Sequence, residues 1–186
     1  MISANLVSKQ LLMKDLGGFI GADTEVRPST TPPVNNRVLP AEAFSFEKLA
    51  AANADVQFRG EKIISNNTPL TNMTAHLFIT EGVITLAPLN FGVAGGSLVS
   101  YIQMNSRQSP IVSAAEISAK GLHLNQLFPG SALAAEDTGT MGGRAKLIGH
   151  GNSVARMLAT ANGESALIMD GGSVGELMLR LSNLDI

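Results

Sequence analysis

The middle of this chain alternates apolar and polar side chains with a period of two residues. Between Met73 and Thr80 every second side chain is apolar, and the same spacing returns from Leu98 to Met104 and from Ile111 to Ile117. Successive side chains of a β-strand point to opposite faces, so this period gives each strand one apolar face. The pattern predicts several consecutive strands that share one sheet.

Short turn signals separate these strands. Glu81-Gly82 and Gly95-Gly96 are expected to form two-residue turns between antiparallel neighbours. Pro88 interrupts the strand between Val83 and Val93 and indicates a bulge or an edge position. We assign Val83 and Ile64 to the apolar side as well. The central prediction is an inner face made of Val56, Phe58, Met73, Leu77, Ile79, Leu89, Phe91, Val93, Ile102 and Met104.

Further elements are expected on both sides of this region. Strands are predicted at residues 2–9, 56–64, 140–150 and 164–170, and short helices at 45–53, 122–128, 153–159 and 174–184. The predicted fold class is mainly β with short helices (α+β). Its sheet is an antiparallel curled meander, which could form an open β-groove capped by helices.

The chain divides into three segments by composition. Residues 1–21 are predicted to be a truncated strand and turn, residues 22–40 a Pro-rich loop or linker, and residues 41–186 a β-rich domain. Both ends carry apolar residues, from which we expect a piece of a longer protein.

Composition excludes several classes of function. Charged residues make up 15% of the chain and the net charge is −2, so there is no basic excess to neutralise nucleic-acid phosphates. The chain contains no Cys, which excludes disulfides and thiolate metal sites. No run of 18 apolar residues occurs, so no segment reads as a membrane-spanning helix.

No residues form a recognisable catalytic motif. His76, His123 and His150 stand alone on different elements, without metal-ligand spacing. The segment from Gly149 to Val154 could be a phosphate loop, but it lacks the third Gly and the Lys of such loops, so a strand-to-helix turn capped by Asn152 or Ser153 is favoured. The remaining candidates are expected to be inert: the carboxylates of Glu136-Asp137, which should be solvated, and two glycosylation-type triplets that begin at Asn66 and Asn72. We therefore predict a protein that is not an enzyme, with no catalytic residue, metal or cofactor.

The apolar face has two readings. It is either an ordinary hydrophobic core or a trough for acyl chains, because burying one methylene contributes about 0.8 kcal/mol without any polar contact. Aromatic residues make up only 4% of the chain, so such a trough would be aliphatic and suited to flexible chains.

Several stretches together resemble the AsmA family of bacterial envelope proteins. They are residues 39–59, Pro69-Leu70, Glu81 to Val83, Leu86 to Gly96, Lys120 to Phe128, Gly149 to Val154 and the Gly-Gly-Ser-Val segment at 171–174. The segment Pro-Leu-Asn-Phe-Gly-Val-Ala-Gly-Gly within them is the most specific, and the resemblance covers essentially the whole chain.

This resemblance implies a location and a role. The family implies a protein anchored in the bacterial inner membrane with a β-rich periplasmic part, of which residues 41–186 would be an AsmA-like domain. We therefore expect a non-enzymatic periplasmic segment whose apolar β-groove serves phospholipid transport or outer-membrane biogenesis, with acyl chains as partners. The alternative is a structural or assembly module whose strand edges contact outer-membrane proteins or assembly factors. An enzyme acting on envelope lipids or glycans is the least favoured reading.

Overall fold

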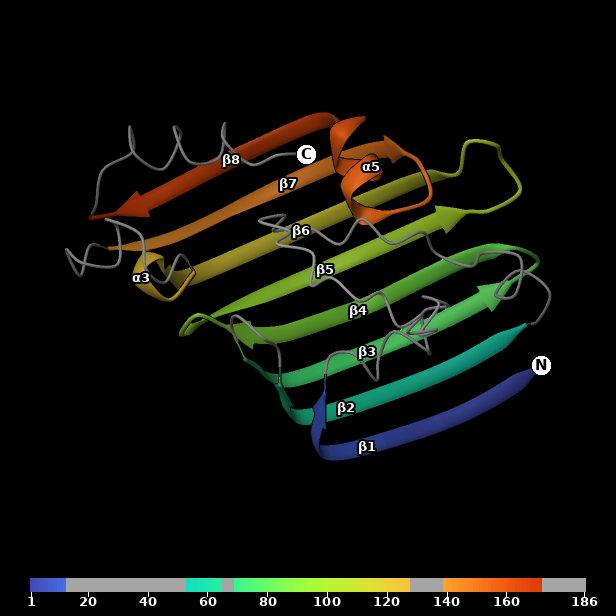
Figure 1. Ribbon diagram of the computed structural model, residues 1–186, viewed down its shortest axis with the longest axis horizontal. Coiled ribbons are helices and arrows are strands. Elements are labelled where there is room, and N and C mark those ends of the chain that lie inside the picture. The colour runs from blue at the N-terminus through green and yellow to red at the C-terminus, as the bar shows by residue number, and fades with distance from the viewer. Residues whose placement is uncertain (13–52, 65–68, 128–138, 172–186) are drawn as a thin grey trace, which may run out of the picture.

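Eight strands and two short helices make up the described part of the chain. The structure is a computed structural model, and it describes residues 1–12, 53–64, 69–127 and 139–171. The elements, labelled as in Figure 1, are β1 (Ile2–Leu12), β2 (Ala54–Ile64), β3 (Leu70–Thr80), β4 (Val83–Val93), β5 (Gly96–Asn105), β6 (Val112–His123), α3 (Leu124–Leu127), β7 (Thr140–His150), α5 (Val154–Ala159) and β8 (Asn162–Asp170).

All eight strands form one sheet in the order of the sequence, from β1 to β8. Neighbours from β2 to β8 are antiparallel, as the meander prediction requires. The strands β1 and β2, however, run parallel, with Ile2 opposite Ala54, so the sheet is mixed and the purely antiparallel prediction is wrong at this edge. A parallel pair needs a long crossover, and the segment 13–53 between these strands is long enough to provide it.

Two tight turns join the central strands. Glu81 and Gly82 both have positive φ, 48° and 77°, as the predicted two-residue turn requires. The next turn lies one residue earlier than predicted. Ala94 and Gly95 occupy it, with φ of 48° and 75°, and Gly96 already begins β5. Nothing in the Ala-Gly-Gly sequence distinguishes the two placements.

A bulge in β4 changes which of its side chains reach the apolar side. The register with β3 and β5 shifts by one residue between Leu86 and Leu89, around Pro88. Before the bulge Ile84 points to the apolar side and is buried, whereas Val83 points to the other side. The assignment of Val83 to the apolar face is therefore wrong.

The alternation of β2 also changes phase. Gly60 and Ile63 are three residues apart and both are buried, and so are Met73 and Leu70 opposite them. Asn72, with φ of 50°, accompanies the change on β3. Ile63 is 0% exposed, so it takes the place that the sequence suggested for Ile64, which is only half-buried.

The helices are short. β6 continues to His123, so only Leu124–Leu127 is helical in the described part of the helix predicted at 122–128, and Leu124 is fully buried. Ser153 caps α5 as predicted: its Oγ accepts a hydrogen bond from the Arg156 backbone N–H at 3.2 Å. The helices expected at 45–53 and 174–184, the Pro-rich segment 22–40 and the Glu136-Asp137 pair lie wholly or almost wholly outside the described residues.

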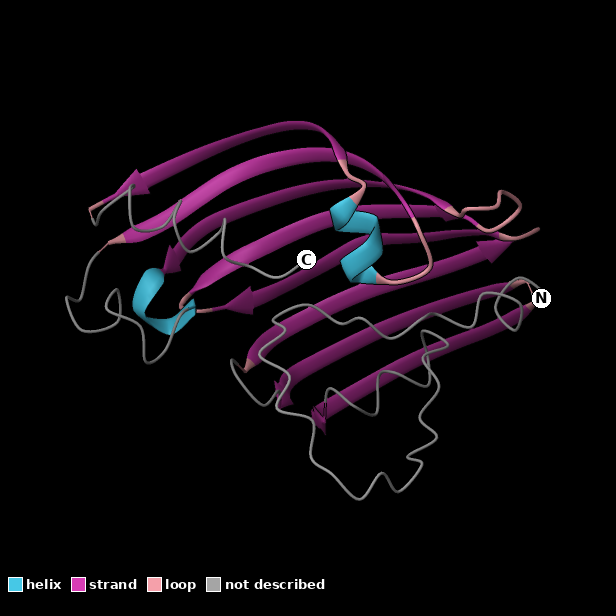
Figure 2. Cartoon of the chain, turned by 45° about the horizontal axis from the view of Figure 1, so that its top comes forward, coloured by secondary structure: helices cyan, strands magenta, loops and turns pink. Residues whose placement is uncertain are grey.

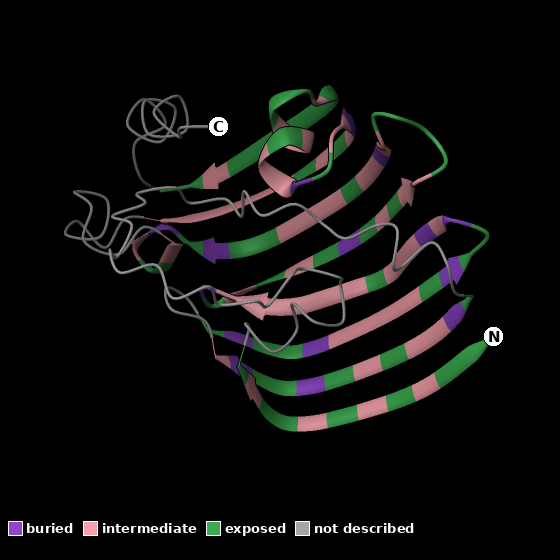
Figure 3. Ribbon diagram, turned by 45° about the vertical axis from the view of Figure 1, so that its right-hand side comes forward, coloured by how far each residue is buried: buried purple, intermediate pink, exposed green. Residues whose placement is uncertain are grey.

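The strands bend into arcs, and α3 and α5 lie at opposite ends of them (Figure 2). Burial varies in bands along the strands (Figure 3), and it alternates from residue to residue along most of β5. Two clusters of buried side chains result. One is formed by Ala54, Ile79 and Ile84, and the other by Ile63, Leu70 and Met73.

Candidate functional site: one apolar face of the sheet

Strand register aligns apolar side chains into rows that cross the sheet. Residues opposite each other in neighbouring strands point to the same face, so a row of partners is a continuous strip of surface. The central row consists of Val56, Leu77, Leu86, Ile102, Ala115 and Leu147. The row next to it consists of Phe58, Ala75, Leu89, Ser100, Ile117 and Ala145. We call the side of the sheet that carries these rows the apolar face.

A third row completes one end of this face. It contains Ala54, Ile79, Ile84, Met104, Ser113 and Gly149. Met157 of α5 packs against its cluster of Ala54, Ile79 and Ile84, so α5 lies on the apolar side of the sheet. We call this row the α5 end.

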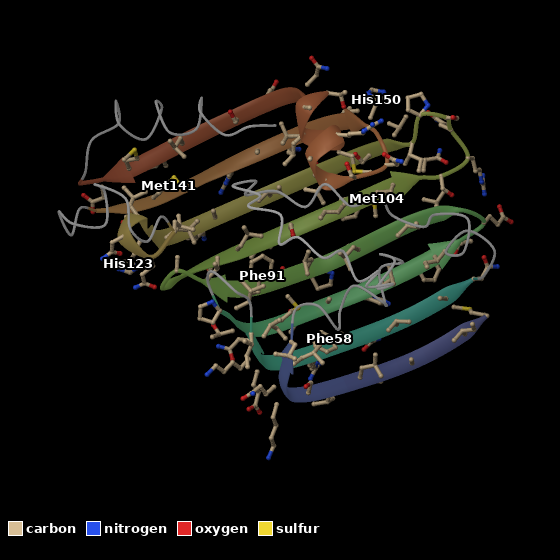
Figure 4. The ribbon with its side chains drawn as sticks, viewed as in Figure 1. Phe58, Phe91, Met104, His123, Met141 and His150 are labelled. Atoms are coloured by element: carbon tan, nitrogen blue, oxygen red, sulfur yellow. The ribbon has the colours of Figure 1, made fainter. Side chains whose placement is uncertain are left out.

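The structure brings all ten predicted residues onto the apolar face. Met73, Phe58, Leu89, Phe91 and Val93 belong to the cluster around Ile63, and Val56, Leu77, Ile79 and Met104 to the cluster around Ile84. Ile102 belongs to neither, but it pairs with Leu86 and Ala115 in the central row. Phe58, Phe91 and Met104, from β2, β4 and β5, can be followed in Figure 4.

Sequence reasoning missed some of the most buried members of the face. Ile84 and Ile63 are 2% and 0% exposed, and neither is among the ten. Both lie where a bulge or a phase change interrupts the alternation. Pro88 is a sequence signal for the first, whereas nothing comparable marks the second.

The apolar face is only partly sealed. Of the ten predicted residues, Met73 and Ile79 are buried, at 6% and 3% exposure, and the other eight are half-buried. Side chains at the centre of a close-packed core are commonly covered more completely than this. These eight side chains therefore remain partly accessible to solvent.

The polar groups on this face are already satisfied. Ser100 is buried and its Oγ donates to the Leu89 carbonyl at 2.8 Å, while the Ser113 Oγ donates to the Gly149 carbonyl at 3.2 Å. Burying a hydroxyl costs little free energy when it is hydrogen-bonded to a carbonyl of a neighbouring strand, and both hydroxyls already have such a partner. The face therefore offers hydrocarbon contact without a fixed polar anchor.

The opposite face of the sheet, which we call the polar face, carries ion pairs together with exposed apolar side chains such as Phe78, Val99 and Ile148. His76 Nε2 lies 2.7 Å from the Asp55 carboxylate, and Lys146 Nζ lies 3.0 Å from that of Glu116. These side chains alternate with those of the apolar face along β2, β3, β6 and β7. The contrast between its two sides makes the sheet amphipathic.

The His residues are dispersed, as their spacing suggests. His76 pairs with Asp55, and His123 Nδ1 lies 3.1 Å from the Ala94 carbonyl at the end of β6. Through its backbone N–H, His150 donates to the Thr160 hydroxyl at 2.7 Å. His123 and His150 stand at opposite ends of the strands (Figure 4). Among the residues that the structure describes, no group of His, Asp or Glu is arranged to hold a metal ion.

The described strands and helices thus define a mainly β protein built on one mixed sheet with two unlike faces. The sequence matches the AsmA family over residues 1–182, so the chain belongs to that family. It is similar to an AsmA family protein from Escherichia coli (strain K12), YhjG, with 30% identity over 197 residues. That alignment covers 100% of this chain but only 29% of the relative, so the chain spans less than a third of the relative's length. No solved structure matches this chain.

Membership of the family suggests a role in the bacterial envelope. Within the described ranges, no helix is both long and apolar enough to cross a membrane.

Proposed function

We propose that this chain is a non-catalytic segment of an envelope protein and that its apolar face holds phospholipid acyl chains. The observation that carries the proposal is the continuity of the apolar rows across β2 to β7 with eight of the ten central side chains half-buried. Covering such side chains with a hydrocarbon chain contributes roughly 25 cal/mol for each Å² removed from water.

The dimensions of the face suit an acyl chain. Five strand spacings separate β2 from β7, the strands that carry the apolar rows, which gives a width of about 24 Å at 4.8 Å per spacing. One leaflet of a bilayer is half of its hydrocarbon core, so an acyl chain is about 15 Å long. A single acyl chain therefore fits across the face.

The chemistry of the face favours lipid over a polar ligand. Ser100 and Ser113, the buried polar residues of its rows, bond to strand carbonyls. A sugar or a nucleotide would lose hydrogen bonds to water there and gain none in return. A headgroup would remain outside the face, in solvent.

Leu77 and Phe78 provide a matched test, because they are neighbours in β3 on opposite faces. Leu77 is half-buried on the apolar face, and Phe78 is 39% exposed on the polar face. The chain is purified from bacterial cells without detergent, and bound phospholipid is extracted and quantified by mass spectrometry. Phospholipid should be present in the unaltered protein, at least five-fold lower in Leu77→Asn, and unchanged in Phe78→Asn.

Two results would contradict the proposal. One is an unaltered protein that carries no phospholipid and takes none from vesicles. The other is an equal loss of lipid in Leu77→Asn and Phe78→Asn when circular dichroism shows that both are folded.

The same proposal includes a location. We propose that the full-length protein is anchored in the inner membrane and holds this segment in the periplasm, where lipid passes toward the outer membrane. The family supports this location. Accessibility of single cysteines to a membrane-impermeant maleimide in intact cells tests it, since the chain contains no Cys of its own.

The edge strand β8 favours a second candidate, a structural or assembly module. Leu167 and Ile168 are 43% and 72% exposed, and β8 pairs only with β7 among the described strands. An exposed edge can add a strand from an outer-membrane protein or an assembly factor. Photo-crosslinking residues at Ile102 and Ile168 separate the two functions: lipid adducts at Ile102 support the first, and protein adducts confined to Ile168 support the second.

A further inference from the structure

The α5 end of the apolar face is covered by the protein itself. Met157 packs against the cluster of Ala54, Ile79 and Ile84, and Ile79 and Ile84 are 3% and 2% exposed. In the neighbouring central row, Val56, Leu77 and Ile102 are all half-buried. On β2 to β4 the covering of the face therefore changes within one row, beside the cluster against which Met104, Ile111 and Met157 pack.

Glycines allow α5 to lie this close to the sheet. A side chain at Gly149 would meet the Met157 carbonyl, and one at Gly151 would meet the Cβ of Arg156. The absence of side chains at both positions lets the first turn of the helix fold back over the end of β7. Thr160 fixes the other end of α5 through hydrogen bonds to both backbone groups of His150, each 2.7 Å long.

The packing of α5 itself is light. The helix has six residues, none of them fully buried, and Met157 is half-buried. Its contact with the cluster is thus made by a flexible thioether side chain, which adapts readily to neighbouring groups. A hydrocarbon chain could offer the cluster contacts of the same kind.

We propose that Met157 closes the α5 end of the apolar face and sets the boundary of the acyl-chain site. This inference rests on the proposed function and names the residue that limits it. Acyl chains then contact the central row around Leu86 and Ile102, whereas Met157, together with Met104 and Ile111, covers the cluster that contains Ile79 and Ile84. Removing the Met157 side chain extends the site by one row.

Mapping of acyl contacts tests this boundary. Vesicles of phosphatidylglycerol and a phosphatidylcholine with a diazirine in its acyl chain are mixed with the protein and irradiated, and adducts are located by peptide mass spectrometry. In the unaltered protein, adducts should fall on residues 100–102 of β5 and be scarce on residues 83–85 of β4. In Met157→Ala, adducts at 83–85 should rise at least five-fold while those at 100–102 stay the same.

Two further variants separate a boundary from a general loosening. Met157→Leu keeps the volume and should behave like the unaltered protein, and Leu158→Ala removes a neighbouring side chain that does not contact the cluster. The boundary is overturned if residues 83–85 are labelled equally in the unaltered protein and in Met157→Ala. It is also overturned if labelling of 83–85 rises as much in Leu158→Ala as in Met157→Ala. In both cases the lipid site itself is still supported, provided that residues 100–102 are labelled. Absence of labelling at both places in every variant overturns the proposed function itself.

Discussion

Ile84 and Val83 are adjacent in β4, so their side chains point to opposite faces of the sheet. The bulge at Pro88 decides that Ile84 and not Val83 reaches the apolar face, because it inserts one residue between Leu86 and Leu89. An unbroken alternation counted back from Leu89 leads to Val83, whereas the actual strand places Ile84 in the cluster with Ala54 and Ile79.

This difference predicts unequal costs of truncation. Ile84→Ala leaves a cavity beneath side chains that cannot fully collapse, so it should lower the free energy of unfolding by about 2–5 kcal/mol. Val83→Ala, on the half-buried opposite side, should cost much less. Urea denaturation followed by circular dichroism measures both, and equal losses would show that the phase of β4 is wrongly placed.

Sequence alternation predicted ten residues of the apolar face but missed Ile63 and Ile84, and both results have the same cause. Period-two alternation specifies a face only within an uninterrupted stretch, and Met73 to Ile79 and Ile102 to Met104 are such stretches. Ile63 lies past a phase change for which Glu61, Lys62 and Asn72 give no decisive signal. The two strands change phase there together, because their register is unshifted from the Gly60–Met73 pair to the Ile63–Leu70 pair.

At the scale of elements, most strands and turns could be predicted from local sequence patterns, but the parallel pairing of β1 with β2 could not. Residues 2–9 were recognisable as a strand, but the direction in which β1 runs beside β2 depends on the long segment between them. A parallel neighbour is possible only because that segment is longer than a hairpin. The residues of β1 and β2 alone do not determine whether the two strands pair in parallel or antiparallel.

Thr160 should control how firmly α5 is held. Its hydroxyl accepts from the His150 N–H and lies near the carbonyls of His150, Arg156 and Met157, at 2.7, 3.0 and 3.2 Å. Thr160→Val keeps the shape and removes these bonds, which should cost about 1 kcal/mol because water can replace part of them at this exposed position. Hydrogen exchange of the His150 amide should accelerate while the exchange of β3 stays unchanged.

Thr80→Val is the matched control for that experiment. Thr80 is exposed at the end of β3 and its side chain makes no hydrogen bond to the residues that the structure describes, so its replacement should leave the exchange of His150 unaltered. If Thr160→Val also leaves it unaltered, the hydroxyl is not what fixes α5 to β7.

At the scale of the whole molecule, the described sheet has two different faces and two edges. The polar face is solvated and carries its ion pairs, and the apolar face is covered in part by α5. Of the described strands, β1 and β8 are the edges of the sheet. Unpaired backbone N–H and C=O groups along an edge strand can pair with another strand, independently of which side chains the two faces carry.

The β8 edge should therefore promote self-association of the isolated chain. Ile168 is 72% exposed on this strand, and a Lys there adds charge that discourages a second strand from pairing. Ile148, 53% exposed on the same polar face, lies on the interior strand β7, so Ile148→Lys adds the same charge away from the edge. Sedimentation velocity over a range of concentrations should show weaker association for Ile168→Lys than for Ile148→Lys. If both substitutions reduce association equally, the apolar side chains of the polar face rather than the strand edge mediate the contact.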